Sequence, residues 1–404
     1  MSVPVVPLAE DDYWQDPYPL LAHLRDEHRT AVTDSGTKAI LRWDDAEALL
    51  KSDDFENEGL EFLERRGFVP GDPLYEWRRH SIGALNGAPH ARIRSLVSRA
   101  LTHRSVDGLR ARIRAHTRDL LRAQAKHGRM EVRADLASRL PFLVVTDFLG
   151  ISIEEAARVG AQMRSGAADA FGPDVTPAIR RNANQTFGAL MAFVSELVEQ
   201  RRRRPREDLL TDLIRVEEAG DRLSHEELIV LFTNIFGGAI ETTASVLTSA
   251  VMLLAQHPEQ AARLREDPER WKQGAAEEVI RHRPGFYAVG KKARRPVEAF
   301  GLAFEAGEPL TILIGGPNRD PSRWSEPDRF DISRDPKLWS LTFSMGNHFC
   351  LGQALARCEI QEVMATVATH CRDLELEADA PRWLPRVMVN RVEALPVRFV
   401  FAEP

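Results

Sequence analysis

Cys350 is the residue of this sequence whose position most clearly allows chemistry. It lies in the stretch from Phe343 to Gly352, and a segment with helical, amphipathic spacing follows at once. The start of a helix carries unpaired N–H groups and a partial positive charge, so it favours a thiolate over a thiol. Such a thiolate can act as a nucleophile or as a soft metal ligand.

A long predicted helix offers a second place for chemistry. Ser224 and Glu227 have the spacing of a capping box, and the helical pattern continues to about Gln256, where Pro258 ends it. At ~1.5 Å per residue this helix would be roughly 50 Å long. We therefore expect it to form the central axis of the molecule.

The middle of this helix contains adjacent glycines, Gly237 and Gly238, followed by Glu241 and Thr242. Two glycines cost about 2 kcal/mol relative to alanine. They can produce a kink that serves helix packing. Alternatively, they can leave a gap where a flat group approaches the backbone, with Glu241 and Thr242 handling protons. The helix alone leaves both interpretations open.

The pattern of residues along the chain predicts the helices and strands that position these side chains. It indicates an α+β protein that is mainly α-helical, with small β-sheets, in one unit over residues 1–404. Helical spacing dominates from His90 to about Leu254, and β-like residues run from Tyr287 to about Ile314. The stretch from Glu56 to Pro89 is interrupted by glycines and prolines and predicts a long loop. The tail from Pro381 to Phe401 alternates like strands.

Composition excludes several classes of protein. Hydrophobic residues make up 43%, enough for a full core, and a net charge of −6 gives no overall attraction to nucleic acid or membranes. The 3 cysteines, Cys350, Cys358 and Cys371, are too few for a disulfide framework. Cys358 has the spacing of a core residue. We see neither a signal peptide nor a membrane-spanning segment and expect a cytoplasmic protein.

Three further segments complete the pattern. Glu278 and Arg281 stand at i and i+3 on a predicted helix, which alone indicates no more than a surface ion pair. Arg329 lies in an irregular stretch before the cysteine, and His90 and Arg94 open an early helix. In this order, together with the cysteine loop and the interrupted helix, these residues resemble those of a cytochrome P450 of the soluble bacterial type, over nearly the whole chain.

The resemblance implies a cofactor, haem b (iron protoporphyrin IX), in a single P450 domain with the long helix over the haem. Cys350 would be the proximal thiolate ligand of the iron. Phe343 would pack near the thiolate side of the porphyrin, and Gly346 would allow the tight turn beneath it. The other expected haem contacts, which include the hydrogen bonds to the propionates, are His90, Arg94, Ala239, Lys291, His348 and Gly352.

The resemblance also assigns the remaining motifs. Glu278, Arg281 and Arg329 would form a structural triad that holds the cysteine loop. Thr242 would hydrogen-bond dioxygen bound at the iron, directly or through water, and Glu241 would relay protons from solvent.

The sequence departs from the family pattern at three places. Ala239 follows Gly238 where the family commonly has a small residue and then glycine, which adds a methyl group near the oxygen-binding groove. Ser344 replaces a frequent glycine, and we expect this replacement to be harmless. Lys291 stands where an arginine commonly binds a propionate, so it supplies charge without a bidentate fork.

The resemblance implies separate electron donors, a ferredoxin and an NAD(P)H-dependent ferredoxin reductase, because the haem domain uses the full chain. A basic segment is either their docking face or an ordinary solvated surface. Its residues are Arg92, Arg94, Arg99, His103 and Arg104.

A mostly apolar or aromatic small molecule is the expected substrate. The candidate pocket residues, each of which could equally be core, are Phe236, Ile240, Phe286, Tyr287, Val289 and Met388. We expect a monomer that binds neither nucleic acid nor membranes and serves bacterial secondary metabolism.

The expected reaction is insertion of one oxygen atom from O2 into this substrate. The first alternative is oxidative coupling or desaturation without oxygen insertion. The others are a haem-thiolate sensing protein without turnover and, more remotely, an enzyme that uses a cysteine nucleophile without haem.

Overall fold

The chain forms two compact units. The first comprises residues 1–55, 110–141 and 242–404, and the second comprises residues 56–109 and 142–241. That the two units belong to a single domain over residues 1–404 stays a prediction. The structure, a computed structural model, describes residues 3–98, 106–163, 167–172, 174–218, 223–377, 381–386 and 388–403.

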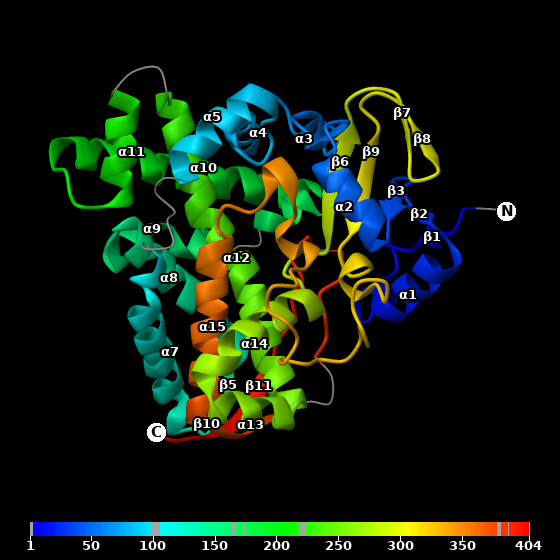
Figure 1. Ribbon diagram of the computed structural model, residues 1–404. Helices are drawn as coiled ribbons and strands as arrows, with labels where there is room; N and C mark the ends of the chain where they lie inside the picture. The colour runs from blue at the N-terminus through cyan, green and yellow to red at the C-terminus, as the bar shows by residue number, and fades with distance from the viewer. Residues whose placement is uncertain are drawn as a thin grey trace. The chain divides into compact units, whose positions relative to one another are not determined.

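A six-stranded sheet dominates the β-structure of the first unit (Figure 1). Its strands are β1 (Val5–Val6), β2 (Thr30–Thr33), β3 (Lys38–Ile40), β4 (Phe55–Glu56), β6 (Ala288–Ala293) and β9 (Pro309–Leu313), in the order β1-β2-β3-β9-β6-β4. β3 pairs with β9 in parallel, whereas β6 pairs with β9 antiparallel. Buried Ile40, Leu310 and Ile312 join a core cluster with Trp43 and Leu50. This core supports the segment that approaches the cysteine loop.

Two smaller sheets complete the β-structure of the first unit. β10 (Cys371–Leu376), β11 (Pro396–Phe401) and β5 (Arg129–Glu131) form one antiparallel sheet. β7 (Val297–Ala299) and β8 (Leu302–Phe304) form a hairpin. The sheets are small, as the sequence predicted.

Helices α7, α14 and α15 pack together in the first unit, and Glu362 of α15 shows how. Glu362 is buried and accepts hydrogen bonds from Arg110 and Arg114 of α7, both at 2.7 Å, and from Lys272 of α14 at 3.2 Å. Three cations on two helices thereby fix α15, which follows the cysteine. The helices of this unit are α1 (Tyr18–Glu27), α2 (Trp43–Lys51), α7 (Arg110–Ala125), α13 (Pro258–Glu266), α14 (Pro268–His282) and α15 (Gln353–His370).

The described part of the second unit is almost entirely helical. Its longest helix, α10, packs against α4, α9 and α11. Leu63, Phe68, Leu74 and Ala183 belong to its buried core. Its helices are α3 (Glu61–Glu64), α4 (Pro73–His80), α5 (Gly87–Ser98), α9 (Ile153–Met163), α10 (Pro177–Arg203) and α11 (Leu209–Glu218), and α8 (Leu140–Leu149) joins it to the first unit along the chain.

The long helix α12 spans His225–Gln256 and continues through both glycines without a break. Its capping box is formed, because the Glu227 N–H donates to Ser224 Oγ at 3.2 Å and the Ser224 N–H donates to Glu227 Oε2 at 2.9 Å. α12 is long and apolar enough to cross a membrane, but 72% of its most apolar stretch is buried inside the protein. It therefore has the character of a core helix.

Two predicted segments differ from the structure. The predicted loop from Glu56 to Pro89 contains α3 and α4, and α5 already begins at Gly87. Its glycines and prolines mark the ends of short helices and not one continuous loop, since Pro73 begins α4. The predicted strands of the tail reduce to β11 and to isolated bridges at Trp383 and Val389.

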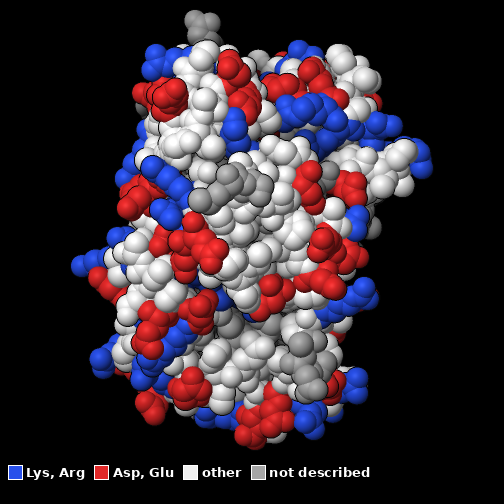
Figure 2. All heavy atoms as spheres, turned by 90° about the vertical axis from the view of Figure 1, so that its right-hand side faces the viewer, with Lys and Arg blue, Asp and Glu red and all other residues white. Residues whose placement is uncertain are grey.

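On the face shown in Figure 2, basic and acidic side chains alternate over short distances.

Candidate active site

The thiol of Cys350 is presented at the start of α15. Gly352 is the N-cap of this helix, and Cys350 lies two residues before it in an exposed position. The Cys350 N–H donates to the Phe343 carbonyl oxygen at 2.9 Å, which closes the loop into a tight turn. An accessible sulfur near a helix N-terminus is suited to act as a thiolate.

Gly346 is required for the shape of this loop. Its φ is +66°, a region that favours glycine. A Cβ at this position would also lie 2.5 Å from the Leu50 carbonyl oxygen. The backbone of the loop therefore packs directly on the end of α2, a contact that the sequence did not predict.

Ser344 carries strain that the sequence analysis missed. Its φ is +61° and its ψ is −169°, a combination that is essentially restricted to glycine. Its hydroxyl oxygen is buried and has no hydrogen-bond partner among the described residues. The expectation that serine replaces glycine harmlessly here is therefore wrong.

Arg281 anchors the segment that leads to the cysteine. Its Nε donates to Glu278 Oε2 at 2.7 Å, and both side chains are 1% exposed. Its Nη1 donates to the carbonyl oxygens of Asn318 at 3.0 Å and Pro327 at 2.7 Å. The predicted helix pair is thus a buried junction and not a surface ion pair.

Asn318, which the sequence analysis did not single out, extends this junction to the cysteine loop. It is fully buried, and its Oδ1 accepts the Leu341 N–H at 2.9 Å while its Nδ2 donates to Thr342 Oγ1 at 2.9 Å. Thr342 in turn donates to the Ile280 carbonyl oxygen at 2.7 Å. The sequence gives no specific signal for this role, because Asn318 stands between Pro317 and Arg319 in a turn that also contains other polar residues.

The third side chain of the predicted triad is a correction. Arg329 is exposed and pairs with Glu326 at 3.2 Å, and only its carbonyl oxygen accepts from Arg281, at 3.3 Å. Arg334 is the second guanidinium at Glu278, at 3.2 Å. The chain turns between the two arginines, so the later one faces the carboxylate.

Arg357 of α15 clamps the aromatic residues of the loop. Its guanidinium lies 4.5 Å from the ring centre of Phe343 and 4.5 Å from that of Trp339, and it pairs with the buried Glu277 of α14. Trp339, which is exposed, stacks on Phe349 with an interplanar angle of 4°. The family resemblance predicted that Phe343 packs beside the thiolate. The structure adds that the guanidinium of Arg357 lies on its ring, a contact that the sequence did not predict.

The interruption of α12 has room beside it. A Cβ on Gly238 would meet no other described atom within 4 Å beyond the helix's own backbone. Ala239, Glu241 and Thr242 are half-buried. The Thr242 carbonyl oxygen lies 2.9 Å from the position of a Cβ on Gly285, so only glycine fits there. A role of this gap and of the two polar residues in catalysis stays a prediction.

Comparison with known proteins decides the family. Residues 173–382 match the family described as Cytochrome P450. The chain is 31% identical to cytochrome P450 monooxygenase PikC of Streptomyces venezuelae over 98% of this chain and 95% of the relative. The chain belongs to the cytochrome P450 family.

Two other P450s give the same result. Polyketide biosynthesis cytochrome P450 PksS of Bacillus subtilis is 28% identical and covers 96% of each chain. The solved structure of CalO2 superposes with a TM-score of 0.90 at 28% identity, covering 98% of this chain and 99% of that one. The chain is thus an oxidoreductase of the monooxygenase type, a haem-iron enzyme with the predicted P450 fold.

Lys291 provides a test of whether this P450's residues fit haem. Its side chain is buried, and the described residues include no hydrogen-bond or ion-pair partner for its ammonium group. Burial lowers the pKa of Lys291 to about 8. A buried cation needs an anion close by, and a haem propionate would supply one. Together with the accessible thiol of Cys350, this donor set fits the cofactor.

The other predicted haem contacts lie on several elements. His348 ends a short helical turn, η6 (Gly346–His348), next to the cysteine. His90 is buried on α5 and Arg94 is half-buried, but both belong to the second unit. Their role at the propionates stays a prediction.

Arg92 of the predicted docking face is used internally in this P450. Its guanidinium pairs with Glu227 of the capping box at 2.5 Å. The main contact of Arg92 is therefore this internal ion pair, and neither solvent nor a docked partner. Arg99, His103 and Arg104 lie outside the described residues.

The predicted substrate residues divide into two groups. Phe286 is 36% exposed and bridges to Val389, next to the half-buried Met388. Phe236, with no exposed surface, packs against Phe142 and Phe193. The structure thus places Phe236 in the core and corrects its assignment to the pocket.

The remaining candidates also pack inward. Ile240 is 2% exposed, and Val289 packs against the core cluster of the large sheet. The Tyr287 hydroxyl shares a hydrogen bond with that of Tyr13, in an aromatic cluster with Trp14. Burial, first, and then the neighbouring tyrosine raise the pKa of Tyr287 well above its usual range. Tyr287 is therefore largely buried, with its hydroxyl turned toward Tyr13.

We expect Ser344→Gly to raise the free energy of unfolding by about 1 kcal/mol. The change removes backbone strain of about 1–3 kcal/mol, partly offset by the greater unfolded-state entropy of glycine. Urea denaturation measures it. Ser340→Gly is the control, because Ser340 has a φ of −83° and its hydroxyl donates to Thr342 at 3.2 Å. Equal effects at the two positions would contradict strain at Ser344.

We expect the haem-free protein to gain stability as pH rises above about 8. The folded-state pKa of Lys291 is below its unfolded value, so between the two values the unfolded chain binds more protons and unfolding becomes harder with rising pH. Urea denaturation from pH 7 to 9.5 should show this rise in the parent and lose most of it in Lys291→Met. Lys38→Met, whose lysine pairs with Glu308, should keep it. Identical pH profiles for the parent and Lys291→Met would refute the assignment.

Proposed function

We propose that this P450 inserts one oxygen atom from O2 into a mostly apolar small molecule, with Cys350 as the thiolate ligand of haem b. The observation that carries the proposal is the exposed thiol of Cys350 at the start of α15, on a loop anchored by Arg281 and Asn318. When bound, the haem iron supplies the centre at which O2 is activated. The protein's residues hold this group and direct protons.

Charge would orient the cofactor. Lys291 presents a buried ammonium group without a carboxylate partner among the described residues. We assign it to a propionate, with His348 from the cysteine loop, and we keep His90 and Arg94 as further propionate donors. Gly346, Gly352 and Phe343 would give the porphyrin a close-packed surface, and we keep Ala239 of α12 as a further haem contact.

Protons would be delivered from α12. Thr242 carries a hydroxyl next to the carboxylate of Glu241, and both are half-buried rather than sealed in the core. A half-buried hydroxyl would hold a proton beside the site of the cofactor, while a neighbouring carboxylate with access to water can replace that proton. Electrons would come from NAD(P)H through a separate ferredoxin and ferredoxin reductase.

The substrate would be apolar and of the size of a biosynthetic intermediate. Phe286 and Met388 present apolar surface from two adjacent segments, since the Tyr287 N–H donates to the Met388 carbonyl oxygen at 3.1 Å. One relative is named for polyketide biosynthesis. We therefore infer a polyketide-like substrate class.

Cys350→Ser should abolish the thiolate-type absorption band of the reduced protein under carbon monoxide, because serine cannot supply a soft anionic sulfur. Cys358→Ala is the matched control, since Cys358 is 1% exposed in the core of α15. Retention of the band in Cys350→Ser would remove Cys350 as the ligand.

Thr242→Ala should raise the yield of hydrogen peroxide per product several-fold, because protons are then delivered without control. The measurement uses NAD(P)H, ferredoxin, ferredoxin reductase and any compound that both proteins oxidise, with product mass to verify the gain of one oxygen atom. Thr243→Ala, at the buried neighbouring position, should leave the ratio near that of the parent. Unchanged coupling in Thr242→Ala would show that another group manages the protons.

A further inference from the structure

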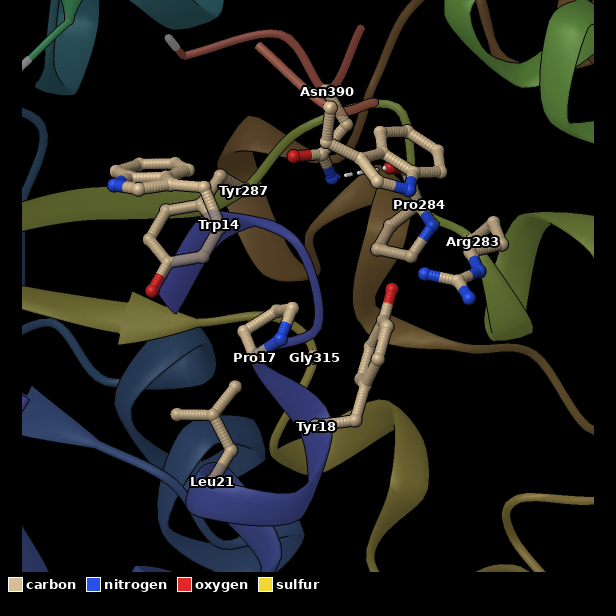
Figure 3. A pocket seen from close by; sticks show the side chains of 10 residues that line it. Trp14, Pro17, Tyr18, Leu21, Arg283, Pro284, Tyr287, Gly315 and Asn390 are labelled. Atoms are coloured by element: carbon tan, nitrogen blue, oxygen red, sulfur yellow. Dashed lines mark hydrogen bonds between the residues drawn. The ribbon is translucent and has the colours of Figure 1, made fainter. Parts of the chain in front are cut away.

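A shallow pocket in the first unit has aromatic walls and a single cation. Most of its space is open to solvent, so a flat ligand would lie against its walls and not be enclosed by them. The walls come from α1 and the turn before it, from the segment after α14, and from the tail (Figure 3). The residues that matter for recognition are Trp14, Tyr18, Arg283, Tyr287, Trp383 and Asn390.

The cation is Arg283, and the protein does not neutralise it. Its guanidinium lies 4.9 Å from the ring centre of Tyr18 and 5.3 Å from that of Trp383. Its Nε is buried without a hydrogen-bond partner, and the described residues include no carboxylate within ion-pair distance of it. Aromatic faces compensate a cation only in part. The pocket therefore keeps unused capacity to bind an anion.

The neighbouring charges strengthen this conclusion. Arg281 and Arg319 are both paired with carboxylates, at 2.7 Å and 2.8 Å. His282 lies beside them and is neutral, because burial, then the charge of Arg319, lowers its pKa to about 2. Arg283 alone of these three arginines lacks an anionic partner among the described residues.

The polar groups around Arg283 favour a carboxylate on a flat ring. Figure 3 shows the Tyr18 hydroxyl pointing toward the side of the pocket where Arg283 lies. The Asn390 Nδ2 donates to the Pro284 carbonyl oxygen at 2.8 Å, which fixes this amide at the pocket. A guanidinium forms charge-assisted, often bidentate hydrogen bonds with a carboxylate, and aromatic walls favour contact with another ring.

We propose that this pocket binds a small planar aromatic carboxylate. The site is independent of the haem assignments, because none of them contributes to it. Behind it, the segment 283–287 packs against α12, where the Thr242 carbonyl oxygen lies 2.9 Å from the position that a Cβ on Gly285 would take. The Asn390 carbonyl oxygen accepts from Ser245 of the same helix. An occupant would thus press on the segment that supports Thr242.

Isothermal titration of the full-length protein with benzoate tests the proposal. Benzoate should bind saturably, and benzamide, which has the ring without the charge, should bind at least about tenfold more weakly, a difference of about 1.4 kcal/mol. Acetate, which has the charge without the ring, should also bind more weakly. Arg283→Gln should weaken benzoate binding about tenfold and remove the preference over benzamide.

The matched control is Arg323→Gln. The Arg323 guanidinium also lies over two rings, at 4.9 Å from Trp43 and 5.8 Å from Trp324, but outside the pocket, so this variant should bind benzoate like the parent. Equal binding of benzoate and benzamide by the parent would overturn the proposal without any variant. So would the absence of saturable benzoate binding up to about 10 mM, or unchanged binding in a folded Arg283→Gln protein.

Discussion

One buried cation determines how the cysteine loop is held. The guanidinium of Arg281 is 1% exposed, and its donors are taken by Glu278 and by backbone carbonyl oxygens of the segment 318–329. A charge buried this deeply is tolerated only when its donors are paired. Any other course of the chain would leave donors without acceptors. The path from Asn318 to the exposed thiol of Cys350 therefore follows from satisfying this charge.

The features that the sequence predicted correctly are local ones. The capping box of α12, the pair of Glu278 and Arg281, the glycine turn at Gly346 and the core position of Cys358 each depend on residues within a few positions of one another. The arginine that pairs with Glu278 from a distant part of the chain could not be predicted in this way. Several arginines lie between residues 319 and 334, and only the folded turn decides that Arg334 reaches the carboxylate while Arg329 stays in solvent.

The aromatic residues after α14 show a second limit of prediction from the sequence, and the geometry of extended segments explains it. An apolar side chain looks the same in a sequence whether it lines a pocket or fills a core. Successive residues of an extended segment point to opposite sides, so Phe286 and Tyr287 could not both line one pocket. The structure separates them, with Phe286 exposed by 36% and Tyr287 bonded to Tyr13 in the core. Periodicity could have limited this prediction to one of the two.

Three cations within eleven residues show how the burial of a charged side chain, together with its partners, indicates its role. Arg281 is neutralised inside the protein, so it is structural. Among the described residues, no anion lies close to the buried Lys291 or to Arg283, which is half-buried between two rings. In a protein where most buried cations have carboxylate partners, an unpaired one reduces stability unless something outside the chain supplies the anion. That requirement connects Arg283 to a carboxylate ligand, and it adds a physical reason to the propionate contact that the family resemblance already implied for Lys291.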